Sequence, residues 1–177
     1  MVKKIAKFFA YMIFFIMALI VFTPKSNAYF FLEKNLKQFE VIVSQERVED
    51  KLFSLNIKDM HVSVKGIDSA LIKEADITLL LAYNSIAFSD IKLSSLVDSF
   101  APSKIDSVKI THTVLNPLYI ICEGVGEFGE ATATLSILDR SVDVVLTPSK
   151  MMLSKYQKSL RQFKKDENGE YRYAKTF

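Results

Sequence analysis

Three glycines are the first residues whose spacing could do chemistry. Gly124, Gly126 and Gly129 match the pattern of a dinucleotide-binding turn. That turn needs a helix after its third glycine, so that the helix N-terminus meets the pyrophosphate, but residues 131–137 alternate and contain β-branched side chains typical of a strand. The neighbouring glutamates would also repel a phosphate. We therefore interpret these glycines as marking a tight turn or a close backbone approach within a sheet.

One cysteine and two histidines are the other side chains that could act as nucleophiles or metal ligands. Cys122 falls on the apolar parity of its predicted strand, the position of a small core residue. His112 shares parity with apolar neighbours and is expected in the core or at the sheet rim, whereas His61 has the opposite parity and should face water. Their spacing matches no zinc pattern, and Glu49 and Asp50 have no partner across a site. We predict no catalytic, cofactor or metal site, and hence a protein that is not an enzyme.

Composition narrows the class of protein further. The chain has 177 residues, 50% of them hydrophobic and 24% charged, which excludes a disordered tail, and a single cysteine excludes a disulfide framework. The net charge of +3 is too small to indicate nucleic-acid binding, but it is unevenly placed: +4 over residues 1–28, −6 over 29–148 and +5 over 149–177.

The first segment predicts attachment to a membrane. Residues 8–22 carry no charge, and Lys3, Lys4 and Lys7 precede them. As a helix, these 15 residues would reach about 22 Å, short of a hydrocarbon core of about 30 Å unless flanking residues join them. The side chains expected to enter the membrane are Phe8, Phe9, Phe14, Phe15, Leu19 and Val21.

Two interpretations of this segment stay open. A cleaved signal peptide is favoured by the small residues before a cut after Ala28. An uncleaved anchor fits better, because apolar character resumes at residues 29–32. With the lysines on the cytoplasmic side, the anchor would be a single inner-membrane span with the N-terminus in the cytoplasm and the main domain in the periplasm.

The remainder predicts a mainly β domain with flanking helices. An amphipathic helix is expected over 29–39, capped by Ser26 or Asn27, and a curved antiparallel meander with one apolar and one wet face over 40–148. Breaks in the alternation predict a bulge near Lys58 and Asp59 and a second shift before Ile91, and residues 94–101 predict a helical turn that closes an open end of the sheet. The candidate apolar face of the sheet comprises Leu79, Leu81, Val108, Ile110 and Leu135.

The final segment, 149–177, predicts a basic amphipathic helix and a last strand. The apolar stripe of this helix comprises Met152, Tyr156, Leu160 and Phe163. Its basic residues are Lys150, Lys155, Lys158, Arg161, Lys164 and Lys165. Either the stripe covers the sheet while the charges are solvated, or the basic face lies against anionic headgroups or an acidic partner.

Several short motifs together resemble the type II secretion system protein N family. They are the end of the apolar segment at Phe22–Pro24, the amphipathic segment through Leu36, Ile91–Leu96, Lys104–Val108, Asn116–Pro117, Gly124–Gly129 and Asp139–Pro148. The resemblance implies a protein anchored in the inner membrane, with a periplasmic antiparallel sheet, that is accessory to an export machine. It implies no catalytic residues.

Two functions follow as expectations. The first is a non-enzymatic docking or scaffold component of a secretion or envelope-assembly system, with protein partners at the sheet edges and the basic helix. The alternative is a periplasmic carrier that shields a lipid or another hydrophobic ligand on the apolar face of the sheet.

Overall fold

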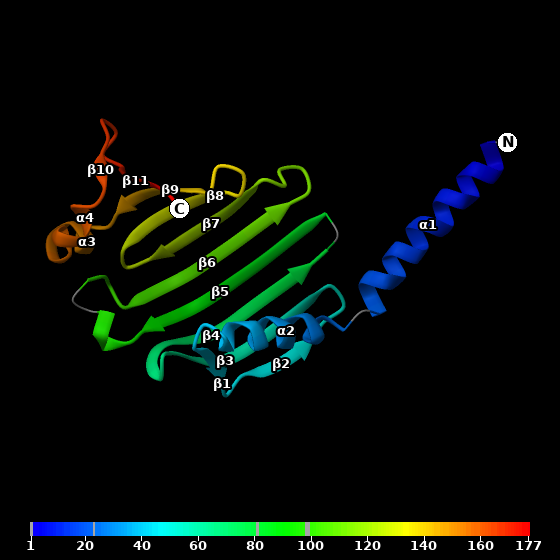
Figure 1. Ribbon diagram of the computed structural model, residues 1–177, viewed down its shortest axis with the longest axis horizontal. Coiled ribbons are helices and arrows are strands. Elements are labelled where there is room, and N and C mark those ends of the chain that lie inside the picture. Colours follow the sequence, from blue (N-terminus) through cyan, green and yellow to red (C-terminus); the bar gives the residue numbers. More distant parts are fainter. Residues whose placement is uncertain (1, 23, 81, 98–99) are drawn as a thin grey trace.

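The computed structural model describes residues 2–22, 24–80, 82–97 and 100–177 (Figure 1). The helices are α1 (Val2–Phe22), α2 (Lys25–Lys37), α3 (Lys150–Lys155) and α4 (Gln157–Leu160), with a 3₁₀ turn, η1, at Ser95–Val97. The strands are β1 (Val41–Ser44), β2 (Arg47–Asp50), β3 (Ser54–Val64), β4 (Ile67–Leu79), β5 (Tyr83–Leu93), β6 (Lys104–Thr113), β7 (Tyr119–Gly126), β8 (Gly129–Ser136), β9 (Ser141–Pro148), β10 (Lys164–Lys165) and β11 (Tyr171–Thr176).

Within the described residues, eleven strands form one antiparallel open sheet. Their order is β1-β3-β4-β5-β6-β7-β8-β9-β11-β10, and β2 also pairs with β3. The chain thus runs as a meander from β3 to β9, and the predicted mainly β, antiparallel architecture is confirmed. The sheet is curved, as Figure 1 shows, and α2, α3 and α4 lie near its two flanks.

The alternation of side chains breaks along one line that crosses four strands. Asp59 and Asp90 adopt left-handed backbone with φ of 57° and 52°. The register places Lys73 of β4 opposite both of these residues, and Asp106 of β6 opposite Asp90. None of these opposed residues forms a regular ladder pair. The ladder is interrupted at one residue in β3 and at the opposing residue in β4. The β3–β4 register is therefore the same on both sides of Asp59. We name this line of four residues the crease.

The sequence predicted this feature in part. The side-chain alternation does change at Asp59 and before Ile91. The bulge expected near Lys58 and Asp59 is wrong, because the neighbouring strand is interrupted at the opposing residue and no extra residue is present there. The register of β3 against β4 shifts only between Val62 and Ser63. A true extra residue occurs where the crease ends, because Asp106 has no counterpart in β7.

Helix α2 packs on the first strands of the sheet through Tyr29. Tyr29 is buried with Leu55, Ile57, Ala75 and Ile77 in the first core cluster. The helix starts at Lys25 and ends at Lys37, so neither Ser26 nor Asn27 is its cap. Instead Asp50 of β2 accepts hydrogen bonds from the backbone N–H groups of Lys25 and Ser26, each at 3.2 Å.

A second core cluster lies at the opposite flank. Met152 and Leu160 are buried against Leu146 of β9, with Tyr156 and Phe163 packed around them. The predicted apolar stripe therefore covers the sheet, but the single helix expected over 150–165 is wrong. The chain breaks at Tyr156, with φ −116° and ψ 28°, and residues 164–165 form β10.

The first helix projects away from the sheet (Figure 1). Of its expected membrane-facing residues, Val21 is half-buried, whereas Phe8, Phe9, Phe14, Phe15 and Leu19 are exposed. In the part of the chain that the structure describes, no helix has both the length and the apolar character required to cross a membrane. The predicted transmembrane helix is therefore not supported by the structure.

Candidate functional site

The strands align their inward-facing residues in rows that run across the whole sheet. Residues directly opposite each other in an antiparallel pair point to the same face, so the register defines each row. One row consists of Leu55, Ile77, Ile86, Ile110, Cys122, Ala133, Val144 and Tyr173. The next consists of Ile57, Ala75, Phe88, Val108, Gly124, Ala131, Leu146 and Tyr171. Every member of these two rows is apolar, aromatic or glycine.

The opposite face of the same strands is polar. One of its rows consists of Asn56, Asp76, Ala87, Lys109, Glu123, Thr132, Val145 and Arg172, so all but two of its members are polar or charged. The rows thus divide into one apolar and one largely polar face, although Asn56, Ser85 and Ser136 on the polar face are buried. The apolar face is the one that α2, α3 and α4 approach.

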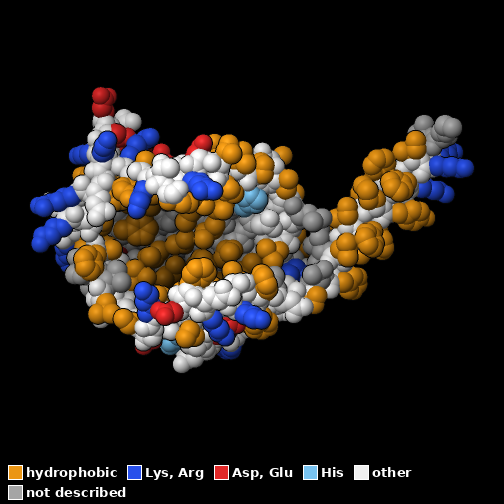
Figure 2. Space-filling view, in the orientation of Figure 1, with side chains coloured by type: hydrophobic (Ala, Val, Ile, Leu, Met, Phe, Trp, Pro, Cys, Tyr) orange, Lys and Arg blue, Asp and Glu red, His pale blue; other side chains and the backbone are white. Residues whose placement is uncertain are grey.

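The middle of the apolar face is less well covered than its two flanks. Each row begins in the first core cluster and ends near the second. In these clusters Leu55 is 0% and Leu146 5% exposed. Between them the side chains of Phe88, Val108 and Ile110 are only half-buried. In Figure 2 this region is a hollow lined by hydrophobic side chains. We call it the trough; its larger lining residues are Ile86, Phe88, Val108, Ile110, Leu135 and Val144.

Small residues give the trough its depth. Cys122 and Gly124 of β7 lie opposite Ala133 and Ala131 of β8, so that four adjacent positions carry little or no side chain. Larger residues flank them on both sides: Phe88 and Val108 on the β5–β6 side, and Val144 and Tyr173 on the β9–β11 side. Phe128 covers Gly124, so the open part of the floor is at Cys122 and Ala133, where small side chains leave room for an apolar guest that a uniformly packed core would not.

Helical segments close two borders of the trough. On the β3 side, α2 leaves a small hollow of about 140 Å³ lined in part by Tyr29, Leu32, Leu79 and Ile86. At one end of the strands, the hydroxyl of Ser159 in α4 donates a hydrogen bond to the carbonyl oxygen of Phe100 in the β5–β6 connection. The predicted turn at 94–101 is described at residues 94–97 and 100–101 and contains η1, but Leu96 is 63% and Phe100 67% exposed, so the expected packing of these side chains against the end of the sheet is not seen.

The glycine motif lies beside the trough and positions Phe128. A Cβ on Gly126 would lie 2.8 Å from Cα of Ile105, and one on Gly129 would lie 2.1 Å from the carbonyl oxygen of Thr147. Phe128 folds back over Gly124 and Gly126 and joins the second core cluster. The prediction of a tight turn with close backbone approach is confirmed, and β8, not a helix, follows Gly129.

Cys122 lies in the trough and His112 lies at its rim. Burial, and to a lesser extent the charge of Glu123, raises the pKa of the Cys122 thiol. The thiol therefore stays protonated at neutral pH and acts as a small hydrophobe. His112 stands at the rim, where its Nε2 lies 3.1 Å from the carbonyl oxygen of Pro117.

Among the described residues, no group of His, Cys, Asp and Glu side chains could hold a metal ion. Comparison with protein-family models, with curated proteins and with solved structures finds no match. The family resemblance noted from the sequence thus remains a resemblance of short motifs.

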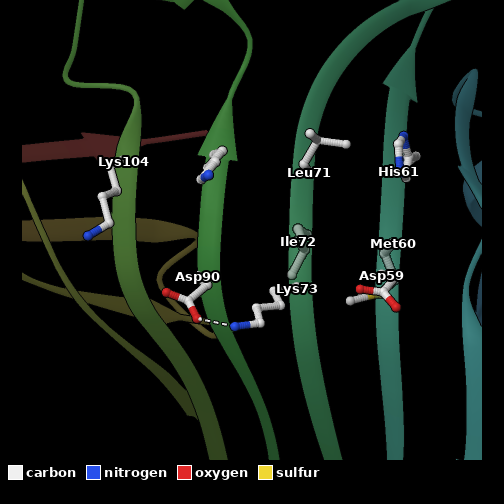
Figure 3. Close-up of a pocket in the computed structure, with 9 residues that line it drawn as sticks. Asp59, Met60, His61, Leu71, Ile72, Lys73, Asp90 and Lys104 are labelled. Carbon is white, nitrogen blue, oxygen red and sulfur yellow. Dashed lines mark ion pairs between the residues drawn. The ribbon is translucent and has the colours of Figure 1, made fainter.

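A second hollow, of about 540 Å³, lies along the crease (Figure 3). Most of its charged lining residues pair with other protein groups: Lys73 Nζ lies 3.6 Å from Asp90 Oδ2, Asp59 bonds Arg47, and Lys104 Nζ lies 3.2 Å from Asp106 Oδ1. Lys92, which is exposed, also lines it. His61 also lines it and is half-buried, less open to water than its parity predicted. Because most of its charges are offset within the protein and it follows the crease, we interpret this hollow as part of the bend in the sheet.

The structure places the sequence-predicted residues as follows. Val108, Ile110 and Leu135 lie together on the trough, Leu79 stands at its edge, and Leu81 lies outside the described residues. The basic residues Lys150, Lys155, Lys158, Arg161, Lys164 and Lys165 are all exposed around α3, α4 and β10. The small residues of the floor were not predicted as site residues, although the alternating small residues of 131–133 carried that signal.

Proposed function

We propose that this protein is a membrane-attached, non-enzymatic binding protein that holds the acyl chain of a lipid in its trough. One observation carries the proposal: two separate core clusters cover the flanks of the apolar face, and the half-buried trough lies between them. A soluble domain of this size would be expected to join such clusters into one core. Here an apolar guest completes the core.

The chemistry of the lining favours an acyl chain over a polar ligand. The two rows that cross the trough present aliphatic and aromatic side chains and no charge among the described residues. A flexible chain gains about 0.8 kcal/mol for each CH₂ group that it buries, without needing a directional partner. A phosphate or a sugar in the same place would lose its hydrogen bonds to water.

Helix α1 supports attachment to a membrane. Its exposed side chains from Phe8 to Phe22 are apolar, and they find no cover on the sheet, from which the helix projects (Figure 1). A lipid bilayer is the environment that buries them. The predicted location of the sheet in the periplasm follows from the N-terminal lysines alone and stays a prediction.

Retention of the N-terminal segment is favoured by the start of α2. A cut after Ala28 would remove Lys25 and Ser26, whose N–H groups bond Asp50. It would also leave Tyr29, a buried core residue, at the new terminus. The uncleaved form therefore keeps α2 docked on the sheet.

The test compares two variants at adjacent positions on opposite faces of β8. Ala133→Phe fills the floor of the trough, and Thr132→Phe places the same ring on the polar face. We expect native mass spectrometry of the full-length protein to show bound lipid on the wild type and on T132F, and little or none on A133F. Equal lipid occupancy of both variants, or none on the wild type, would contradict the proposal.

A role as a docking component, the function that the sequence favoured first, is supported by one edge of the sheet. Strand β10 pairs only with Tyr171 and Arg172 of β11, so within the described residues the outer edge of 173–176 carries no neighbouring strand. Such an edge can pair with a strand of another protein. Site-specific crosslinking from Lys175 in membranes tests this second function, since recovery of the protein alone would count against it.

A further inference from the structure

We propose that the end of the sheet from which α1 leaves is a membrane-docking surface that rests on an anionic lipid bilayer. The occupant of the trough belongs to the function proposed above, and this inference deepens it by stating where the lipid enters. The docking itself rests on a separate set of residues.

The register brings several connections to this one end. Strands β4, β6 and β8 run toward it, and β5, β7 and β9 run away from it. The connections 51–53, 114–118 and 137–140 therefore all lie there. The backbone N–H of Lys25, the first residue of α2, bonds the side chain of Asp50, which ends β2 next to the connection 51–53. Helix α1, which precedes Lys25, therefore leaves the domain at the same end.

These connections carry large apolar side chains at their tips. We name the following six the apolar rim: Leu52, Val114, Leu115, Leu118, Ile137 and Leu138. Leu115 is 97% and Leu138 72% exposed, and the other four are exposed as well. The opposite end also exposes Ile67, Leu96 and Phe100. Connections usually carry polar residues because water surrounds them, so six exposed apolar residues on three connections at one end indicate an interaction surface.

The charges around the apolar rim fit an anionic surface. Arg140 and Lys175 are exposed beside it. Two of the nearby acids are engaged within the protein: Asp139 accepts a hydrogen bond from Ser136 Oγ at 2.7 Å, and Asp50 accepts the N–H groups that begin α2. Asp143 is exposed on the polar face of the sheet. Apolar tips with flanking basic residues are the combination that binds the interface of an anionic bilayer.

Attachment through α1 favours this occupant over a second protein. A helix held in lipid keeps the apolar rim near the bilayer and raises the effective concentration of lipid around it. The apolar rim also lies at the end of the strands where the trough is not closed by α4. Docking would therefore place this end of the trough at the membrane surface, where an acyl chain could slide between bilayer and protein.

The chain contains no tryptophan, so a single introduced tryptophan reports on its own surroundings. We would place Leu115→Trp and Leu138→Trp in the apolar rim. As a matched control, Ile67→Trp lies at the opposite end, at the first residue of β4 next to the β3–β4 turn, where Ile67 is 53% exposed. Each full-length variant is reconstituted into phosphatidylcholine–phosphatidylglycerol vesicles, with or without brominated acyl chains.

We expect the two rim tryptophans to emit at shorter wavelength and to lose intensity to the brominated chains, while Ile67→Trp keeps the same emission in both vesicles. Adding Leu138→Asp to the Leu115→Trp variant should restore much of the lost intensity. Unquenched rim tryptophans would overturn the inference, and a blue shift without quenching would assign the surface to a protein or a second copy of the chain.

Native mass spectrometry of the same variants separates this result from the proposed function. Lipid bound to a protein with an unquenched rim would leave the trough proposal standing and remove the docking surface. Quenched rim tryptophans on a protein without bound lipid would do the reverse.

Discussion

Gly129 fixes the turn that places Phe128 against the second core cluster. Its φ is +113°, a conformation that residues with a Cβ rarely adopt, and a Cβ there would lie 2.1 Å from a carbonyl oxygen. We expect Gly129→Ala to lower the free energy of unfolding by about 3 kcal/mol or more, because backbone atoms must move. Gly66→Ala is the control, since Gly66 also has positive φ, +74°, but no atom near its Cβ position. A similar loss in both variants, measured by urea denaturation, would show that close approach at Gly129 is unimportant.

Asp50 makes the docking of α2 sensitive to acid. Desolvation raises the pKa of its carboxyl, but hydrogen bonds from Ser26 and Lys25 and the charge of Lys25 outweigh this and lower it below its usual value. A carboxyl whose pKa is lower in the folded state stabilises the fold above its unfolded pKa, about 3.9, and loses that contribution as the pH falls through the folded value. We expect the protection factors of the amides in the first turn of α2, each taken against the intrinsic exchange rate at the same pH, to fall below about pH 4.

The variant Asp50→Asn should show the lower protection factors already at neutral pH, with a loss of about 0.5–1 kcal/mol as for other exposed helix caps. Glu49→Gln is the neighbouring control, because Glu49 pairs with Lys58 at 3.3 Å and does not contact α2. If D50N and E49Q exchange alike, Asp50 does not cap the helix.

Single positions were predictable where parity alone decides their surroundings. Cys122, Val108 and Ile110 lie on the apolar face as their alternation predicted. Asp50 was not predictable as the cap of α2, because it is 24 residues or more away along the chain from the N–H groups it binds.

The elements at the C-terminal flank act as a cover for one side of the trough. Met152 is 6% exposed in the second core cluster, whereas its neighbour Leu153 is 39% exposed. We expect Met152→Ala to cost about 2–4 kcal/mol of unfolding free energy and Leu153→Ala less than about 1 kcal/mol. Equal effects in a denaturant titration would mean that α3 does not pack as a cover.

Element types followed from periodicity, and element ends did not. The meander was predictable because its strands alternate over many residues with few interruptions. The break of the basic helix at Tyr156 was not, since the apolar stripe from Met152 to Phe163 keeps helical spacing across it. Tertiary packing onto Leu146 and the pairing of β10 with β11 override the helical pattern there.

At the scale of the whole molecule, the exposed basic residues of α3, α4 and β10, here called the basic cluster, and the apolar rim lie at opposite ends of the sheet. The basic cluster comprises Lys150, Lys155, Lys158, Arg161, Lys164 and Lys165. Strand β9 runs from Ser141 near the apolar rim to Pro148 near α3, and its eight residues span about 26 Å. The sequence left open whether the basic residues reach the membrane, because periodicity does not encode which end of the sheet a helix occupies. With α1 leaving at the apolar rim, the docking proposed for that rim would hold these basic residues at the end of the sheet away from the bilayer.

Charge reversal at this cluster should therefore leave membrane contact unchanged. We expect the double variant Lys158→Glu and Arg161→Glu to retain wild-type bromine quenching of a tryptophan at Leu115. The same reversal at Arg140 and Lys175 should weaken that quenching, and more so at low ionic strength because surface charges are then least screened. The opposite pattern would place the basic cluster at the membrane.

Photocrosslinking tests most directly whether the trough holds an acyl chain. The full-length protein in nanodiscs would be irradiated with a phospholipid that carries a diazirine in its acyl chain, and the labelled residues mapped by mass spectrometry. We expect label on Val108, Ile110 and Cys122 in addition to α1, and loss of the trough label in Ala133→Phe with the α1 label unchanged. Label confined to α1 and the apolar rim would contradict a lipid-binding trough.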